Sequence, residues 1–192
     1  MRKIIGVDID GVLADFTGTA RKLCKNLFNG RPDDSSIQTG WGFDSLGISK
    51  DEENLMWKAI DSIPNWWMTL EKLPQTYMLE QLIGEGHRVI FITNRKDGAG
   101  VPVDLQSAIW LKEKHRLRHA NVVLSDDKGP VAKGLKLDYY IDDRDKNVLE
   151  VLQAAPNCKT FMCRWPWKPS FQDGFPRTVD NFNEFAKIVL ET

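Results

Sequence analysis

The residues of greatest chemical interest are two pairs of aspartates, each at the end of an apolar run. Asp8 and Asp10 end the run in KIIGVDIDG near the N-terminus, and Asp142 and Asp143 end the run in LDYYIDD. Two such carboxylates about 4 Å apart would repel each other by about 4 kcal/mol at an effective dielectric constant of about 20. A cluster of this kind needs a cation, and hard oxygen ligands favour Mg²⁺.

The strands that carry these residues decide whether the side chains meet. Short apolar runs alternate along the chain with segments of helical periodicity, which is typical of a parallel sheet covered by helices on both faces. The sequence therefore predicts an α/β fold with a doubly wound, five-stranded parallel sheet. The predicted strands are 3–8, 87–94, 121–125, 137–142 and 158–163, and the predicted helices are 16–28, 49–63, 74–86, 102–117, 129–136, 145–155 and 179–190.

The carboxyl ends of parallel strands lie at one edge of the sheet, where open α/β sheets bind their ligands. Thr93 and Asn94 end the second predicted strand and so join the acidic pairs at this edge. A single aspartate after a strand usually caps a helix or makes a turn, and this interpretation would account for Asp142 or Asp143 alone. The combination of three such strand ends favours a shared site for a metal ion and a phosphate group.

Residues 17–74 interrupt the alternation of strands and helices. They contain polar, turn-rich loops and a helix at whose start Ser49 and Glu52 have the spacing of a capping box. We predict that this segment is a small helical cap inserted after the first strand, over a core formed by residues 1–16 and 75–192. A cap in this place would sit above the ligand-binding edge of the sheet.

Three short segments resemble motifs of the haloacid dehalogenase superfamily of phosphotransferases. DIDGVLADF resembles the first motif, FITN the second and YYIDDR the acidic fourth. The resemblance covers residues 1–16 and 75–163, and its first and fourth motifs are the specific ones. It implies the Rossmann-like core of that superfamily.

The resemblance also implies roles for the residues at the strand ends. Asp8 would be the nucleophile that forms an aspartyl-phosphate, and Asp10 would protonate the leaving oxygen and then activate water. Gly11 would allow a tight turn beneath the phosphate. Thr93 would donate a hydrogen bond to a phosphoryl oxygen, with help from the backbone of Asn94.

A magnesium site follows from the same resemblance. Asp143 would bind Mg²⁺ together with Asp8 and the backbone carbonyl of Asp10. Asp142 would be a second ligand or would act through water.

The third motif of the superfamily is a single lysine close to the phosphate. Lys128 best fits the usual position at the start of a helix, and Lys133 is the alternative. Lys136 is expected to lie on the exposed side.

The segment IPNWWMTLEKLPQTYMLEQL resembles the return from cap to core in the 5'(3')-deoxyribonucleotidases. Trp66 and Trp67 stand where that family has a pair of aromatic residues lining the base and sugar pocket, and we expect one of the two to pack inward. Trp41 and Phe43 are weaker candidates for the pocket. Trp57 is predicted to belong to the core of the cap.

Three features depart from that family or remain open. The second motif continues as Thr-Asn-Arg where the family commonly has Thr-Ser-Pro, so Arg95 could contact the phosphate or the cap. RWPWKPSF (164–171) is predicted to be a proline-rich surface loop, with nucleic-acid stacking as the alternative. His115 and His119 are predicted to lie on an exposed basic helix end, with a metal-binding pair as the alternative.

Whole-chain properties limit the classes of partner. The 26 lysines and arginines balance 27 aspartates and glutamates, which gives no indication of binding to membrane surfaces or long nucleic acids. No apolar stretch is long enough to span a bilayer, and acids interrupt the apolar run at the N-terminus, so no signal peptide is expected. The three cysteines lack metal-binding spacing and are typical of reduced thiols in a cytoplasmic protein.

The sequence therefore predicts a Mg²⁺-dependent phosphomonoesterase acting on small nucleoside monophosphates, in the first place deoxyribonucleotides. A homodimer is compatible with the sequence. One alternative is a polynucleotide 3'-phosphatase, since parts of the chain also resemble the phosphatase domain of phage-type polynucleotide kinases. Near-neutral charge and an occluding cap argue against long nucleic-acid substrates. The other alternative is an inactive nucleotide-binding member of the superfamily.

Overall fold

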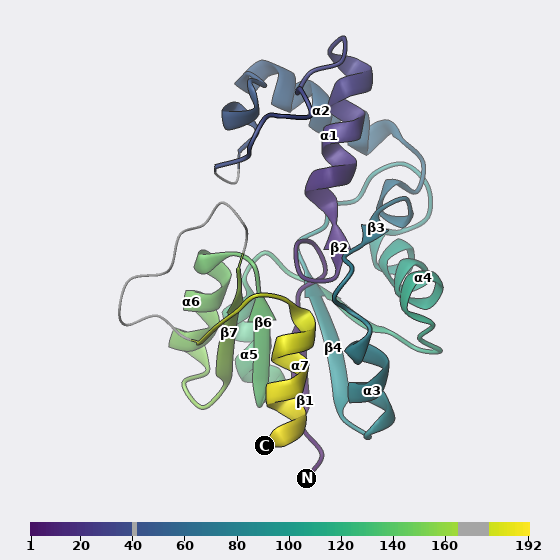
Figure 1. Ribbon diagram of the computed structural model, residues 1–192. Helices are drawn as coiled ribbons and strands as arrows, with labels where there is room; N and C mark the ends of the chain where they lie inside the picture. Colours follow the sequence, from purple (N-terminus) through teal and green to yellow (C-terminus); the bar gives the residue numbers. More distant parts are fainter. Residues whose placement is uncertain (40–41, 165–176) are drawn as a thin grey trace.

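The computed structural model describes residues 1–39, 42–164 and 177–192. Its centre is a six-stranded parallel sheet with the strand order β5-β4-β1-β6-β7-β8 (Figure 1). The strands are β1 (Ile4–Val7), β4 (Arg88–Thr93), β5 (Asn121–Leu124), β6 (Tyr139–Asp142), β7 (Lys159–Cys163) and β8 (Arg177–Val179). The doubly wound α/β architecture is confirmed.

The prediction of five strands was wrong, because β8 adds a sixth at the edge of the sheet. β8 has only three residues, which pair in parallel with β7, and a segment this short carries no periodic pattern of its own. The sequence predicts that the closing helix starts at Val179, which is instead the last residue of β8. That helix, α7 (Phe182–Glu191), starts later because the Asn181 side chain accepts a hydrogen bond from the backbone N–H of Glu184 and so caps it.

Helices cover both faces of the sheet, and β4 illustrates how its side chains are divided between them. Val89 and Phe91 pack in one apolar cluster with α3 (Met78–Gly84), α4 (Val103–His115) and α7, whereas Ile90 and Ile92 pack in a second with α5 (Lys128–Leu135) and α6 (Asp145–Ala154). Burial of both faces explains the continuous apolar runs in the strands. Among the described residues, no helix is long and apolar enough to cross a bilayer.

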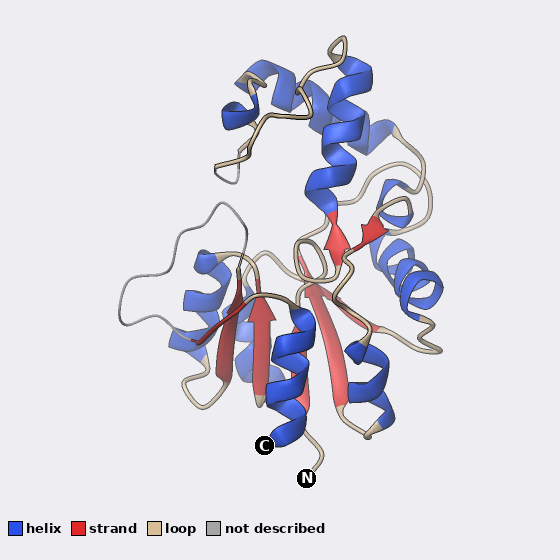
Figure 2. Cartoon of the chain, in the orientation of Figure 1, coloured by secondary structure: helices blue, strands red, loops and turns tan. Residues whose placement is uncertain are grey.

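The segment between β1 and α3 forms helices beyond the carboxyl edge of the sheet (Figure 1). It enters through β2 (Ala14–Asp15) and returns through β3 (Glu71–Lys72), which pair antiparallel in a two-stranded connection to the core (Figure 2). Between them lie α1 (Phe16–Leu27), α2 (Lys50–Ser62) and two short 3₁₀ helices, η1 (Asp44–Leu46) and η2 (Trp66–Met68). The cap boundary at residues 17–74 stays a prediction.

Local capping interactions fix the two long helices of this segment. Asp15 accepts a hydrogen bond from the backbone N–H of Gly18 at 2.8 Å and so caps α1. Ser49 and Glu52 form the predicted capping box at the start of α2. By contrast, α3 begins at Met78, four residues after Pro74, where the sequence predicted its start.

The prediction of an exposed basic helix end was wrong for His115. This residue ends α4 and is 3% exposed, with its ring edge-on to Trp110 at a centroid distance of 5.2 Å. His119 lies outside the helix and is exposed. The helical i, i+4 pairing required for a metal-binding pair is therefore absent from this part of the described chain.

The buried His115 should make the fold sensitive to mild acid. Burial, with a smaller contribution from Lys72, lowers the pKa of His115 from 6.5 to about 4. Between these values the unfolded chain binds a proton that the folded chain does not, so the free energy of unfolding decreases as the pH falls through this window. We expect this one residue to account for about 2 kcal/mol between pH 7 and pH 5.

Urea unfolding of His115→Gln at both pH values measures this effect, with the exposed His119→Gln as the matched control. The His115 variant should show a flatter dependence of stability on pH than the wild type, and the control should follow the wild type. Equal slopes in all three proteins would contradict the assignment.

Candidate active site

The structure joins Asp8 to Lys128 at the carboxyl edge of the sheet. Asp8 follows β1, and its backbone N–H donates to the Ile141 carbonyl of β6 at 3.0 Å. Lys128 is the first residue of α5, and its Nζ lies 2.5 Å from Asp8 Oδ1. The Lys128 side chain is 2% exposed, whereas Lys133 and Lys136 are exposed. Of the three candidate lysines, Lys128 is the one in contact with Asp8.

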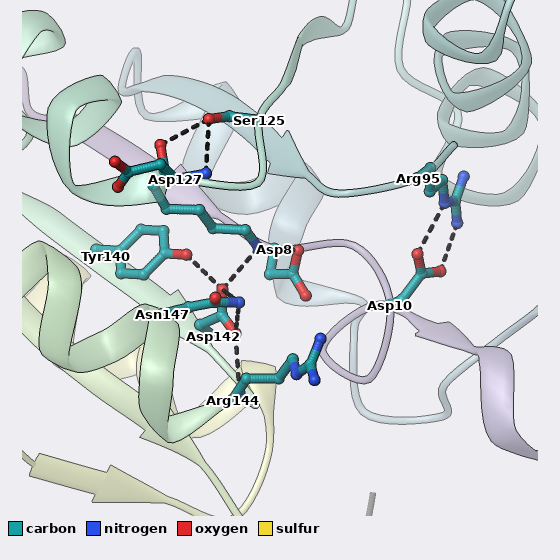
Figure 3. Close-up of polar contacts among 10 residues, drawn as sticks. Asp8, Asp10, Arg95, Ser125, Asp127, Tyr140, Asp142, Arg144 and Asn147 are labelled. Carbon is teal, nitrogen blue, oxygen red and sulfur yellow. Dashed lines mark hydrogen bonds and ion pairs between the residues drawn. The ribbon is translucent and has the colours of Figure 1, made fainter. Parts of the chain in front are cut away.

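Asp142 is the anchor of a hydrogen-bond network around this lysine (Figure 3). Its Oδ2 accepts from Lys128 Nζ at 2.7 Å and from the Tyr140 hydroxyl, and its Oδ1 accepts from the Arg144 backbone N–H at 2.8 Å. The Asn147 amide donates to both oxygens, at 3.0 and 3.1 Å. Both carboxylate oxygens of Asp142 are thus already engaged by protein donors.

Burial and charge shift the pKa values of this pair in ways that keep the lysine charged. Burial raises the pKa of Asp8 to about 7, and the charges of Asp142 and Asp10 add to this effect against the opposing attraction of Lys128. Burial alone would lower the pKa of Lys128, but the carboxylates of Asp142 and Asp8 outweigh it and raise that pKa well above its ordinary value. A further cation beside Asp8 would favour its ionised form.

The residues of this site fit a divalent metal ion. Asp8, Asp142 and Asp143 are buried, and each presents a carboxylate oxygen within 4.8 Å of the others. Buried carboxylates at this spacing require compensating positive charge, of which Lys128 supplies one unit. A ligand set made only of oxygen atoms suits a hard cation such as Mg²⁺.

Asp10 lies in the same loop as Asp8 but turns toward a different cation. Gly11 has a φ of +83°, a conformation that favours glycine, and its N–H donates to the Ala14 carbonyl at 2.8 Å to close the turn. Asp10 forms a two-point ion pair with Arg95, which follows β4 (Figure 3). The first and second sequence motifs are therefore in direct contact.

A cavity of about 420 Å³ opens beside these residues, a size within the range of small-molecule sites. The wall formed by the core contains Lys128 and the residues at the strand ends. Its opposite wall comes from the cap. The residues that line it are Asp8, Asp10, Gly11, Phe16, Thr17, Phe43, Glu53, Trp57, Trp67, Thr93, Asn94, Arg95, Lys96, Lys128, Asp143, Arg144 and Asn147.

The paired tryptophans of η2 have different surroundings. Trp67 lines the cavity, and its Nε1 donates to the Lys96 carbonyl at 2.9 Å. Trp66 is buried and is not among the residues that line the cavity. Phe43 lines the cavity, and Trp41 lies outside the described residues, as do residues 165–171 of the basic aromatic segment.

The prediction that Trp57 belongs to the core of the cap was wrong. Met56 and Ile60 form the buried stripe of α2, while Glu53 and Trp57, on the adjacent stripe, line the cavity. Trp57 is 37% exposed, and its ring stacks on Phe16 with centroids 5.4 Å apart.

Sequence reasoning did not single out several other residues at this site. Phe16 lies at the entrance to the cap and stacks on Trp57 and Trp67. Tyr140 and Asn147 hold Asp142, and Glu53 lines the cap wall. Tyr140 lies within the fourth motif, YYIDDR, and Asn147 lies in the first turn of the helix that follows it, so these two had a local indication.

Comparisons with known proteins agree with this geometry. The sequence model of the family described as "5' nucleotidase, deoxy (Pyrimidine), cytosolic type C protein" matches residues 2–164. A protein of Chlorobaculum tepidum named "Putative 5'(3')-deoxyribonucleotidase" is 28% identical over 158 residues, which are 77% of this chain and 73% of the relative.

Solved structures show the same fold at low sequence identity. A haloacid dehalogenase family hydrolase of Deinococcus radiodurans, solved with bound phosphate and sodium, has a TM-score of 0.60 and 13% identity and covers 99% of this chain and 96% of its own. A haloacid dehalogenase-like hydrolase of Xanthomonas campestris has a TM-score of 0.54 and 16% identity, with coverage of 99% and 95%. The chain therefore belongs to the cytosolic type C 5'-nucleotidase family and is a phosphoric monoester hydrolase with the haloacid dehalogenase fold.

Proposed function

We propose that this protein is a Mg²⁺-dependent 5'(3')-deoxyribonucleotidase, which hydrolyses nucleoside monophosphates through an aspartyl-phosphate intermediate. The observation that carries this proposal is a single cavity that joins two chemically different walls. The buried Asp8–Lys128 pair lies on one wall, and the rings of Phe16, Trp57 and Trp67 lie on the other. A phosphate group at the first wall would place a nucleoside against the second.

In the first half-reaction, an Asp8 carboxylate oxygen attacks phosphorus, and the bond from phosphorus to the sugar oxygen breaks. Asp10 gives a proton to that leaving oxygen. Lys128, held by Asp142, offers its ammonium to the phosphoryl oxygens, while Thr93 and the backbone of Asn94 donate hydrogen bonds to them. The products are the free nucleoside and phosphorylated Asp8.

In the second half-reaction, Asp10 takes a proton from water, which attacks the phosphorylated Asp8 and releases inorganic phosphate. Asp8 and Asp143, with the Asp10 backbone carbonyl, would hold Mg²⁺, which supplies positive charge to the phosphoryl oxygens when bound. We assign Asp142 to Lys128 and not to the metal, because protein donors already engage both of its oxygens.

The aromatic wall supports a substrate that carries a base. Phe16 stacks on Trp67 with centroids 6.0 Å apart and on Trp57, so the cavity offers a ladder of apolar faces. Stacking of a nucleobase on such a face contributes about 1–3 kcal/mol per base. The preference for deoxyribonucleotides rests on the family description and on the name of the relative from Chlorobaculum tepidum.

Trp57→Ala should weaken nucleotide binding without disabling the chemistry. We expect KM for a deoxyribonucleoside monophosphate to rise about tenfold, the lower end of the stacking contribution, with little change in kcat. Leu55→Ala is the control, since Leu55 is 54% exposed on the same helix and does not line the cavity. An unchanged KM in the Trp57 variant would show that this side of the cavity does not bind the base.

A panel of substrates tests the proposed function as a whole. Mg²⁺-dependent phosphate release should be fastest with deoxyribonucleoside monophosphates, slower with ribonucleotides and slowest with a 3'-phosphorylated oligonucleotide. A preference for the oligonucleotide would favour a polynucleotide 3'-phosphatase. Nucleotide binding without phosphate release from any substrate would favour a non-catalytic member of the superfamily.

A further inference from the structure

Arg95 is a buried cation beside the candidate active site, and the sequence left its role open between the phosphate and the cap. Its Nε donates to Asp10 Oδ2 at 2.9 Å and its Nη2 to Oδ1 at 2.7 Å (Figure 3). Nη1 donates to Ser107 Oγ on α4 at 3.1 Å. The guanidinium also lies over the rings of Trp67 and Trp110, with centroid distances of 5.1 and 5.6 Å.

These contacts make Arg95 a rigid support. Its side chain has no exposed surface, whereas that of Asp10 is 24% exposed and lines the cavity. A guanidinium that meets both oxygens of a carboxylate fixes the plane of that group as well as its position. Asp10 needs such a support, because it stands in a turn outside the sheet ladder, where its side chain could otherwise rotate.

The two acids of the first motif are held by separate cations. Lys128 approaches Asp8 from α5, on one side of the loop, and Arg95 approaches Asp10 from the end of β4. Figure 3 shows the two carboxylates turned toward different partners. Each oxygen of Asp10 accepts one hydrogen bond from Arg95 and keeps a further lone pair, which can carry the transferred proton.

We propose that Arg95 is the positioning residue for the acid–base carboxylate of Asp10. This inference rests on the proposed function, because it assumes that Asp10 transfers protons. Arg95 lines the cavity, but its three guanidinium nitrogens all donate to Asp10 or Ser107, so we assign it no contact with the reacting atoms. It acts by holding Asp10 at the place where the leaving oxygen departs.

The test compares two substrates whose leaving groups differ in their need for a proton. A sugar hydroxyl must be protonated as it leaves, whereas 4-nitrophenolate leaves as a stable anion. The ratio kcat/KM reports the steps up to the first irreversible one, which is transfer of the phosphoryl group to Asp8. Loss of an aligned general acid should therefore lower kcat/KM for a deoxyribonucleoside monophosphate much more than for 4-nitrophenyl phosphate.

We expect Arg95→Gln to lower kcat/KM for the nucleotide by about 10²-fold or more, the scale of general acid catalysis, and for the aryl phosphate by less than about fivefold. Arg95→Lys keeps the charge but cannot contact both oxygens of Asp10 as the guanidinium does. Its kcat/KM should fall less than that of Arg95→Gln, and again more for the nucleotide than for the aryl phosphate. Asp10→Asn combined with Arg95→Gln should be no worse than Asp10→Asn alone, since both changes remove one function. Arg88→Gln removes an exposed arginine at the opposite end of β4 and is the matched control.

Each outcome decides between positioning and a purely structural ion pair. Equal losses with both substrates, or additive losses in the double variant, would show that Arg95 only supports the fold and would overturn the proposal. If Arg95→Gln does not fold, the substrate ratio of Arg95→Lys decides in the same way. If the wild-type protein cleaves neither substrate, the proposed function is refuted. If the wild type cleaves both and the Arg95 variant loses both activities equally, only the positioning role of Arg95 is refuted.

Discussion

Replacing Asp8 with asparagine is expected to lower phosphate release from a nucleoside monophosphate by on the order of 10⁵-fold, the scale seen when a covalent nucleophile is removed. The amide of asparagine has the size of the carboxylate, so packing at the end of β1 should be retained. It cannot form the acyl phosphate through which the reaction is proposed to proceed. Substrate binding should persist, because Lys128, Thr93 and the aromatic wall remain.

Two measurements separate loss of chemistry from loss of structure in this variant. Steady-state phosphate release gives the turnover, and thermal unfolding should stay close to that of the wild type. A burst of nucleoside release ahead of phosphate release in the wild type would report the covalent intermediate directly. Substantial turnover by Asp8→Asn would exclude the aspartyl-phosphate route and leave direct attack by water.

Lys128→Ala is expected to lose about 10³-fold or more in turnover, whereas Lys133→Ala is expected to behave like the wild type. Lys128 Nζ lies 2.5 Å from Asp8 and 2.7 Å from Asp142, so its removal takes away the ammonium that would meet the phosphate. It also leaves buried carboxylates without their partner, a change that typically costs 3–5 kcal/mol of stability. Lys133 is exposed in the last turn of α5, where substitutions usually change stability by less than about 0.5 kcal/mol.

Turnover and urea unfolding should be measured together for these variants. Lys128→Met keeps most of the aliphatic length of the side chain and so separates the loss of charge from the loss of packing. It should resemble Lys128→Ala in turnover. If Lys133→Ala were the inactive variant and Lys128→Ala the active one, the assignment of the third motif would be reversed.

The first residues to which we assign the chemistry lie close together in the sequence. Asp8, Asp10 and Gly11 are neighbours in the chain, and their strand is recognisable because burial of both sheet faces leaves a continuous apolar run. The capping box of Ser49 and Glu52 is local for the same reason, since it spans a single helical turn. Interactions within a few residues are those that sequence patterns can predict.

Partners that are distant in the chain were decided by tertiary packing. Lys128 meets Asp8 across 120 residues, and Arg95 meets Asp10 across 85. The sequence left Lys128 or Lys133 open for one role and Asp142 or Asp143 open for another. The periodicity of a helix or strand predicts which face a residue occupies but not which side chain packs opposite it. The contact of α5 with the edge of the sheet brings Lys128 to Asp8, and donors from α5, β6 and α6 surround Asp142.

The cap shows the same limit of sequence reasoning. Trp57 and Ile60 are three residues apart on α2, which is compatible with one apolar stripe, yet one lines the cavity and the other is buried. Trp66 and Trp67 are adjacent, and η2 turns only the second toward the cavity. The sequence by itself therefore determined the α/β fold class and the reaction class, phosphoric monoester hydrolysis, because local patterns at strand ends indicate both. Only the tertiary structure decided which aromatic faces and cations surround the proposed substrate site, because that depends on how distant helices pack.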